Sequence, residues 1–187
     1  LRKPLIVMTP KSLLRHKLSV SAFDELTRGS FQCVVNEIDE LSPLDVTRVV
    51  FCSGKVYFDL LEARRADEAR NVAIVRIEQL YPFPSEDYAA ALAHYPNARE
   101  IVWCQEEPQN QGAWYQIRHR LQGSLQGNQE LLYSGRRPAA APATGIPQMH
   151  STEQHGLVAA AITASTQEQS ARATPRLRAR ASNRKKS

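Results

Sequence analysis

Short apolar runs alternate along this chain with segments of helical periodicity. Runs rich in β-branched residues predict strands over residues 5–8, 46–52, 71–77 and 100–104. Between and after them, apolar residues recur at helical spacing and predict helices over residues 56–70, 86–95 and 113–121. Because strands that alternate with helices at this spacing form parallel sheets, we predict an α/β protein with a doubly wound, mostly parallel sheet of about five strands.

Less regular segments predict the remaining elements. Ser85 is expected to cap the helix over residues 86–95, and Thr152 a last helix over residues 153–164. The other expected elements are a basic turn or short helix over 11–17, a helix from Ser19 or Ser21 that Gly29 ends, strands over 31–38 and 131–133, and a loop over 134–148 rich in Ala and Pro.

A concentrated polar stretch follows the strand over residues 100–104. Residues 105–112 are predicted to form a loop, which carries the side chains of Glu106, Glu107, Asn110 and Gln111. In open parallel sheets, ligands and partners lie outside the carboxyl ends of the strands. Two interpretations stay open: a solvated connection in which Pro108 stops the strand, or a loop that contacts another domain or subunit.

The side chains around this loop favour packing over catalysis. Trp103 and Trp114 flank the loop, and tryptophan carries a large apolar area with one donor to satisfy, which favours a packed loop. Glu106 and Glu107 are adjacent, so on an extended backbone they point to opposite sides. That geometry argues against a paired-carboxylate acid–base couple. We therefore assign no catalytic residue in this chain.

A glycine-lysine turn follows the strand over residues 46–52. Ser53, Gly54 and Lys55 precede a predicted helix, where backbone donors favour an anion. The phosphate-binding loop of nucleotide hydrolases requires a longer pattern that this stretch lacks. The turn is therefore interpreted either as a mild anion site or as a tight strand-to-helix connection made by Gly54.

A second group of basic side chains lies near the N-terminus. Lys11, Arg15 and Lys17 stand within seven residues, together with His16. They form either a solvated turn or a site for a phosphate or an acidic surface. Lys55 and these three residues are thus candidates for contacts with an anion.

The charge of the chain is uneven. The 187 residues carry a formal charge of +5, but seven of the 24 basic residues lie after residue 171, where there is no acid. The preceding part has 24 − 7 = 17 positive against 19 negative residues. We predict a domain over residues 1–165 and a basic disordered tail over residues 166–187, and any nucleic-acid partner would depend on that tail alone.

Further features limit the class of protein. No apolar run reaches the roughly 20 residues that a membrane span requires, and no secretory signal is recognisable. The three cysteines, Cys33, Cys52 and Cys104, are widely spaced and predict buried free thiols in a reducing compartment. The five histidines are scattered without a metal-binding or triad pattern, so we predict no metal site. The chain begins directly in a strand-like segment, which suggests a piece of a longer polypeptide.

Five stretches of the sequence together resemble a known family. They are KPLIVMTPKSLLRHKLSVS (3–21), RVVFCSGKVYFDLLEARR (48–65), VAIVRIEQLYPFP (72–84), VWCQEEPQNQGAW (102–114) and AAPATG (140–145). The chain from residue 1 to about 164 resembles the C-terminal domain of thiamine-diphosphate-dependent 2-oxoglutarate dehydrogenase, a transketolase-like enzyme. The segment over residues 167–187 is unlike the usual short ending of this family.

The resemblance implies a function for the whole enzyme. Such an enzyme is a homodimer that decarboxylates 2-oxoglutarate on thiamine diphosphate with Mg²⁺ and passes the succinyl group to a lipoyl-bearing succinyltransferase. The resemblance places the cofactor and metal upstream of this domain, so we expect the chain alone to bind neither and to be inactive. It makes Glu106, Glu107, Asn110 and Gln111 an interdomain or dimer surface. Because this domain takes part in regulation by a nucleotide or acyl-CoA in some relatives, it also makes Lys11, Arg15, Lys17 and Lys55 our candidates for an anionic effector. The enzyme is expected in the bacterial cytoplasm or in the mitochondrial matrix. The alternative is a stand-alone module that binds a nucleotide or acyl-CoA.

Overall fold

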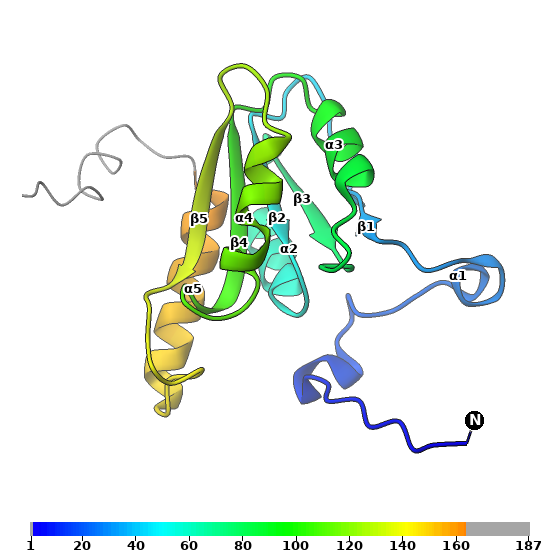
Figure 1. Ribbon diagram of the computed structural model, residues 1–187, viewed down its shortest axis with the longest axis vertical. Helices are drawn as coiled ribbons and strands as arrows, with labels where there is room; N and C mark the ends of the chain where they lie inside the picture. The colour runs from blue at the N-terminus through cyan, green and yellow to red at the C-terminus, as the bar shows by residue number, and fades with distance from the viewer. Residues whose placement is uncertain (1, 164–187) are drawn as a thin grey trace, which may run out of the picture.

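A five-stranded sheet between two layers of helices forms the body of the protein (Figure 1). The computed structural model describes residues 2–163. In chain order its elements are η1 (Lys11–Arg15), α1 (Phe23–Arg28), β1 (Val34–Val35), β2 (Arg48–Cys52), α2 (Val56–Ala66), β3 (Val72–Ile77), α3 (Ser85–Ala93), β4 (Glu100–Pro108), α4 (Trp114–Gly123), β5 (Glu130–Arg136) and α5 (Pro147–Ile162).

The order of the strands confirms the predicted doubly wound α/β fold. The sheet has the order β1-β3-β2-β4-β5. Strands β2 to β5 pair in parallel, whereas β1 pairs with β3 in the antiparallel direction. The chain therefore moves from β2 outward to β3 and then crosses to the other side of β2 for β4 and β5. The order in which the chain adds strands therefore reverses between β2 and β4.

Helices cover both faces of the sheet. Helices α3 and α4 pack with Phe51 and Trp103 on one face, while α2 and α5 pack with Val50 and Val102 on the other. All five residues of β2 are buried. Coverage of both faces explains why the strands have continuous apolar runs rather than alternating ones.

Helix α5 is attached to the start of the sheet by a buried arginine. Arg48 is 1% exposed, and its Nη1 donates to the carbonyl oxygens of Ala160 (3.2 Å) and Ala161 (2.8 Å). Its Nε donates to Glu100 Oε2 at 2.9 Å. A guanidinium this deeply buried requires such partners, because an unpaired buried charge is costly. These contacts place the C-terminal end of α5 at the edge where β2 begins.

Two of the predicted strands differ in the structure. Residues 5–8 are exposed and belong to no strand, so that prediction is wrong for the described chain, where no neighbouring strand supplies hydrogen bonds. The strand predicted over residues 31–38 is reduced to β1. There Glu37 turns inward, and its Oε2 accepts a hydrogen bond from the Ile74 N–H at 2.7 Å.

Other predicted boundaries also need correction. Strand β4 continues to Pro108, so residues 105–108 are not part of a loop. Helix α3 begins at Ser85, with Pro84 rather than Ser85 as its N-cap. Helix α5 begins at Pro147 rather than after Thr152. Helix α1 begins at Phe23, with Ala22 rather than Ser19 or Ser21 as its N-cap, and it ends at Gly29 as predicted. The 3-10 helix η1 accounts for the predicted basic turn.

The remaining predictions concern the cysteines, membrane spans and the basic tail. Cys52 and Cys104 are buried and Cys33 is half-buried, and all three are free thiols, as the sequence predicts. No helix within residues 2–163 is long and apolar enough to cross a membrane. The basic tail predicted over residues 166–187 lies outside the described residues.

Candidate functional site

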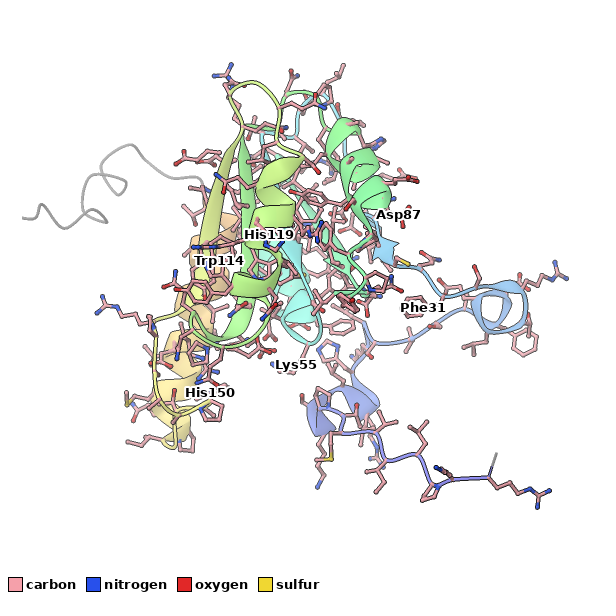
Figure 2. All side chains as sticks on the ribbon, viewed as in Figure 1. Phe31, Lys55, Asp87, Trp114, His119 and His150 are labelled. Carbon is pink, nitrogen blue, oxygen red and sulfur yellow. The ribbon has the colours of Figure 1, made fainter. Side chains whose placement is uncertain are left out.

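The carboxyl ends of β2 and β4 define the candidate site, because the winding of the sheet reverses between these two strands. Open α/β sheets bind their ligands in the crevice at such a reversal. Figure 2 shows Lys55 toward the lower end of the view, with Trp114 and His119 higher up on α4. The polar stretch that the sequence singles out lies here, on the last residues of β4 and the turn that follows.

Gln105 organises this edge from inside. Its side chain is 3% exposed. Its Oε1 accepts hydrogen bonds from the Trp103 indole N–H (2.9 Å) and from the Trp114 backbone N–H (3.0 Å). Its Nε2 donates to the carbonyl oxygens of Glu107 (3.3 Å), Pro108 (3.2 Å) and Gln111 (2.8 Å). The two tryptophans that flank the polar stretch are therefore joined through one amide.

The turn after β4 depends on a glycine. Gly112 has a φ of +65°, a conformation that residues with a Cβ atom rarely adopt. A Cβ atom at this position would lie 3.0 Å from both Gln105 Nε2 and Glu107 Oε2. The glycine thus lets the turn fold back tightly over the Gln105 amide and lead directly into α4.

Glu106 and Lys55 belong to a closed polar cluster between α2 and α5. Lys55 Nζ lies 2.7 Å from Glu106 Oε1 and 3.3 Å from Asp59 Oδ2. Gln154 Nε2 donates to the same two carboxylates, at 3.0 and 2.7 Å. Burial opposes the charge on Lys55, but the hydrogen bond and the charges of Glu106 and Asp59 outweigh it and raise its pKa. Lys55 is therefore a cation that is already neutralised.

Asn110 and Gln111 hold the loop that follows β5. Asn110 Nδ2 donates to the Ala139 carbonyl (3.0 Å), and Asn110 Oδ1 accepts from the Ala139 N–H (2.9 Å). Gln111 Nε2 donates to the same carbonyl at 3.1 Å. These two carboxamides therefore connect the turn after β4 to the loop after β5.

Glu107 points to the opposite side of the sheet from Glu106, as their adjacent positions predict. It is exposed and makes no ion pair within residues 2–163. It lines a crevice of about 900 Å³ at the reversal of the sheet. Aromatic and apolar side chains form most of the lining, and His119 and Arg120 of α4 add positive or titratable groups. Among the four polar residues named from the sequence, Glu107 is the one whose carboxylate faces this open crevice.

The four predicted anion-binding residues do not share one environment. Lys11, Arg15 and Lys17 are exposed around η1. Between them, His16 packs against Phe58 with ring centroids 5.4 Å apart, and its Nε2 lies 3.3 Å from Glu62 Oε1. Lys55 is engaged with two carboxylates. The anionic effector stays a prediction, and Gly54, at a φ of +76°, makes the tight turn that was its alternative.

Two residues that sequence reasoning missed support the site. Gln105 is one of them, and Arg136 is the other: its Nε donates to the Glu106 carbonyl at 2.5 Å. A buried amide between two tryptophans in a strand was a possible signal for Gln105. Nothing local in the sequence marks Arg136. Among the described residues, no group of three or more histidine, cysteine, aspartate or glutamate side chains could hold a metal ion.

These features define a class, a doubly wound α/β domain. Internal hydrogen bonds fix its polar strand ends, and an open crevice lies where the order of its strands reverses. Within that class, the family model described as 2-oxoglutarate dehydrogenase C-terminal matches residues 20–162. The chain belongs to this family, as its sequence motifs indicate.

Several curated relatives are described as 2-oxoglutarate dehydrogenase E1 components. The 2-oxoglutarate dehydrogenase E1 component of Haemophilus influenzae is 55% identical over 162 residues, which cover 87% of this chain and 17% of that protein. The E1 component of Azotobacter vinelandii is 51% identical over 166 residues, covering 87% and 18%. The chain thus spans about one sixth of the length of these relatives. A solved structure described as split gene transketolase, inactive beta4 tetramer, aligns with 61% of this chain and 37% of its own, at 16% identity and a TM-score of 0.47.

Proposed function

We propose that this chain is the C-terminal domain of an enzyme that decarboxylates 2-oxoglutarate and transfers the succinyl group to a lipoyl-bearing partner. The match of residues 20–162 to the family model is the observation that carries the proposal. Thiamine diphosphate and Mg²⁺ would be bound by the preceding part of such an enzyme, and we assign no reaction step to residues of this chain.

The role proposed for the domain is to support the assembly of the enzyme. The edge at the end of β4 is rigid, because the Gln105 amide and the Asn110 and Gln111 braces fix it. A rigid polar edge suits a contact with a neighbouring domain or subunit, since little side-chain entropy remains to be lost on contact. Glu107, which has no internal ion pair in the described chain, is the residue best placed to meet a cation across that contact.

The test of this function is a chimaera. The matching 162 residues of the Haemophilus influenzae protein are replaced by this chain, and turnover of 2-oxoglutarate is measured with thiamine diphosphate and Mg²⁺. We expect the chimaera to convert 2-oxoglutarate and this chain alone to be inactive. Turnover by the chain alone would contradict the proposal, and so would an inactive chimaera that is folded and has the oligomeric state of the parent.

A matched pair of variants tests the supporting role of the strand ends. Glu107→Gln removes the carboxylate that faces the crevice, whereas Glu130→Gln removes an exposed carboxylate at the opposite edge, where β5 begins. In the chimaera, we expect the Glu107 variant to weaken subunit or domain association and the Glu130 variant to leave it unchanged. Equal behaviour of the two variants would remove Glu107 from the contact.

A further inference from the structure

A second cavity, which we call the α5 cavity, lies between the end of β5, the loop that follows it and α5. Figure 1 shows the chain leaving β5 and looping round to the start of α5 at the lower left of the view. The cavity has a volume of about 880 Å³, within the range of pockets that hold small ligands. Much of its wall is apolar and is formed by Ala139, Ala141, Ala143, Leu157 and Ala160.

Arg136, the last residue of β5, is the main polar group in this wall. Its side chain is only 10% exposed. Its Nε donates to the Glu106 carbonyl at 2.5 Å, and its Nη1 donates to Thr144 Oγ1 at 3.3 Å. A guanidinium has more N–H donors than these two bonds use, and Nη2 makes no hydrogen bond within residues 2–163. A buried cation with unused donors beside a cavity favours an anion there.

The charged side chains around the α5 cavity leave one positive charge in excess. Arg136 and Arg137 line the cavity together with a single carboxylate, that of Glu153. Glu153 Oε2 lies 3.9 Å from Arg136 Nη1, too far for a hydrogen bond, and accepts instead from Thr144 Oγ1 at 2.7 Å. Arg137 is exposed and makes no ion pair in the described part of the chain. An anion of single charge would therefore balance the cavity.

The start of α5 adds a second electropositive feature. This helix of 16 residues begins at Pro147 after Ile146, which offers no side-chain cap, and its first turn contains no acidic residue. Met149 of that turn lines the cavity. The free N–H groups and the dipole at the start of a helix favour negative charge. The helix start and the Arg136 guanidinium thus favour the same kind of ligand.

Gly156 leaves room in the wall of the cavity. It lies inside α5, where glycine is less favourable than alanine. A Cβ atom at this position would meet nothing within 4 Å, so packing within the described chain does not require a glycine. Because Gly156 lines the α5 cavity, its missing side chain keeps volume available to a ligand.

We propose that the α5 cavity binds a small monocarboxylate with a short apolar body. The unused N–H groups of Arg136 match the two oxygens of a planar carboxylate, and the apolar body lies against the alanine side chains and Leu157. A phosphate brings more negative charge than the cavity can balance and no apolar part to contact its walls. The inference goes beyond the proposed function, because the binding does not require the rest of a decarboxylating enzyme.

A nuclear magnetic resonance titration of the isotope-labelled chain with hexanoate tests the proposal. We expect the Gly156 amide and the Arg136 Nε–H signals to shift, with a dissociation constant of about 1 mM. Hexanamide should bind at least about 10-fold more weakly because it lacks the charge, and acetate because it lacks the apolar body. No shift at about 10 mM hexanoate, or equal binding of hexanamide, would overturn the proposal. Displacement of hexanoate by an equal concentration of inorganic phosphate would overturn it too.

Two matched glycine variants locate the bound hexanoate. Gly156→Leu fills the cavity and leaves Arg136 in place, so we expect it to weaken binding by at least about 10-fold. Gly123→Leu is the control, because a Cβ atom there also meets nothing within 4 Å and Gly123, at the end of α4, does not line the cavity. Equal binding by the two variants would place hexanoate elsewhere and overturn the proposal.

A variant of the arginine tests the geometry of recognition. Arg136→Lys keeps the positive charge but removes the paired donors, so it should weaken hexanoate binding by at least about 10-fold while acetate and hexanamide remain weak. Full binding by a folded lysine variant would contradict the role given to the guanidinium.

Calorimetry on the chimaera separates this proposal from the proposed function. We expect hexanoate binding that the Gly156→Leu change removes, as in the chain alone. A chimaera that converts 2-oxoglutarate but has lost this binding would overturn the proposal, by assigning Arg136 to a carboxylate of the preceding part of the enzyme. A folded chimaera that binds hexanoate in this way but is inactive would contradict only the assigned activity.

Discussion

Replacing Gln105 by leucine removes a buried amide without opening a large cavity, since the two side chains have similar volumes. The change abolishes five hydrogen bonds and leaves two buried donors, the Trp103 indole N–H and the Trp114 backbone N–H, without an acceptor. An unsatisfied buried donor costs about 1–3 kcal/mol. The Pro108 carbonyl loses less, because it also accepts from the Gln111 N–H at 2.8 Å. We expect a loss of about 3–5 kcal/mol in the free energy of unfolding.

Urea and thermal unfolding of the chain measure this loss. For a domain of this size, the midpoint temperature should fall by roughly 10 °C. Gln116→Leu is the matched control, because Gln116 is exposed at the mouth of the same crevice and its variant should differ by less than about 0.5 kcal/mol. A loss below about 1 kcal/mol for the Gln105 variant would refute the view that this amide organises the strand ends.

Two further predictions follow from the protonation states. Burial raises the pKa of the Cys104 thiol to about 12 and that of Cys52 well above its ordinary value, so only half-buried Cys33 should react with a thiol reagent at pH 8 in the folded chain. The hydrogen bond from Arg65 lowers the pKa of Asp39, so its stabilising effect exists above the unfolded pKa and disappears as the pH falls through the folded one. Asp39→Asn should therefore lower stability at pH 7, by about 1 kcal/mol, and have no effect near pH 2 in urea titrations. Reaction of all three thiols, or a pH-independent effect, would contradict these assignments.

The central strands and helices could be predicted because their signal is local. A fully buried strand such as β2 is apolar at every position, and the helices that cover it carry regular apolar stripes. The sequence predicts β4 only as far as Cys104, because residues 105–108 are largely polar. Contacts with distant residues give this segment its extended conformation. Pro108 is paired with Arg136 of β5, and the Gln105 side chain is buried. Long-range pairing of this kind leaves no mark within the segment itself.

The sequence could predict where the candidate site lies but not which side chains contact one another there. The order of elements places the residues after β4 at the reversal of the sheet, and the sequence shows that they are polar. Which carboxylate pairs internally depends on α5, since Gln154 completes the cluster that holds Glu106 and Lys55. The start of that helix at Pro147 had a local signal, a proline at its first turn, which the surrounding alanine and proline residues obscured.

The Arg48 contacts determine where the end of α5 lies. Because Arg48 holds the carbonyls of Ala160 and Ala161 at the edge where β2 begins, the chain leaves α5 at the end of the sheet opposite the crevice. A fluorescent label attached at Thr163, directly after α5, would lie at the opposite end of the strands from Glu107. The same geometry makes such a label a distance reference: energy transfer to a second dye near the crevice would span the length of the strands.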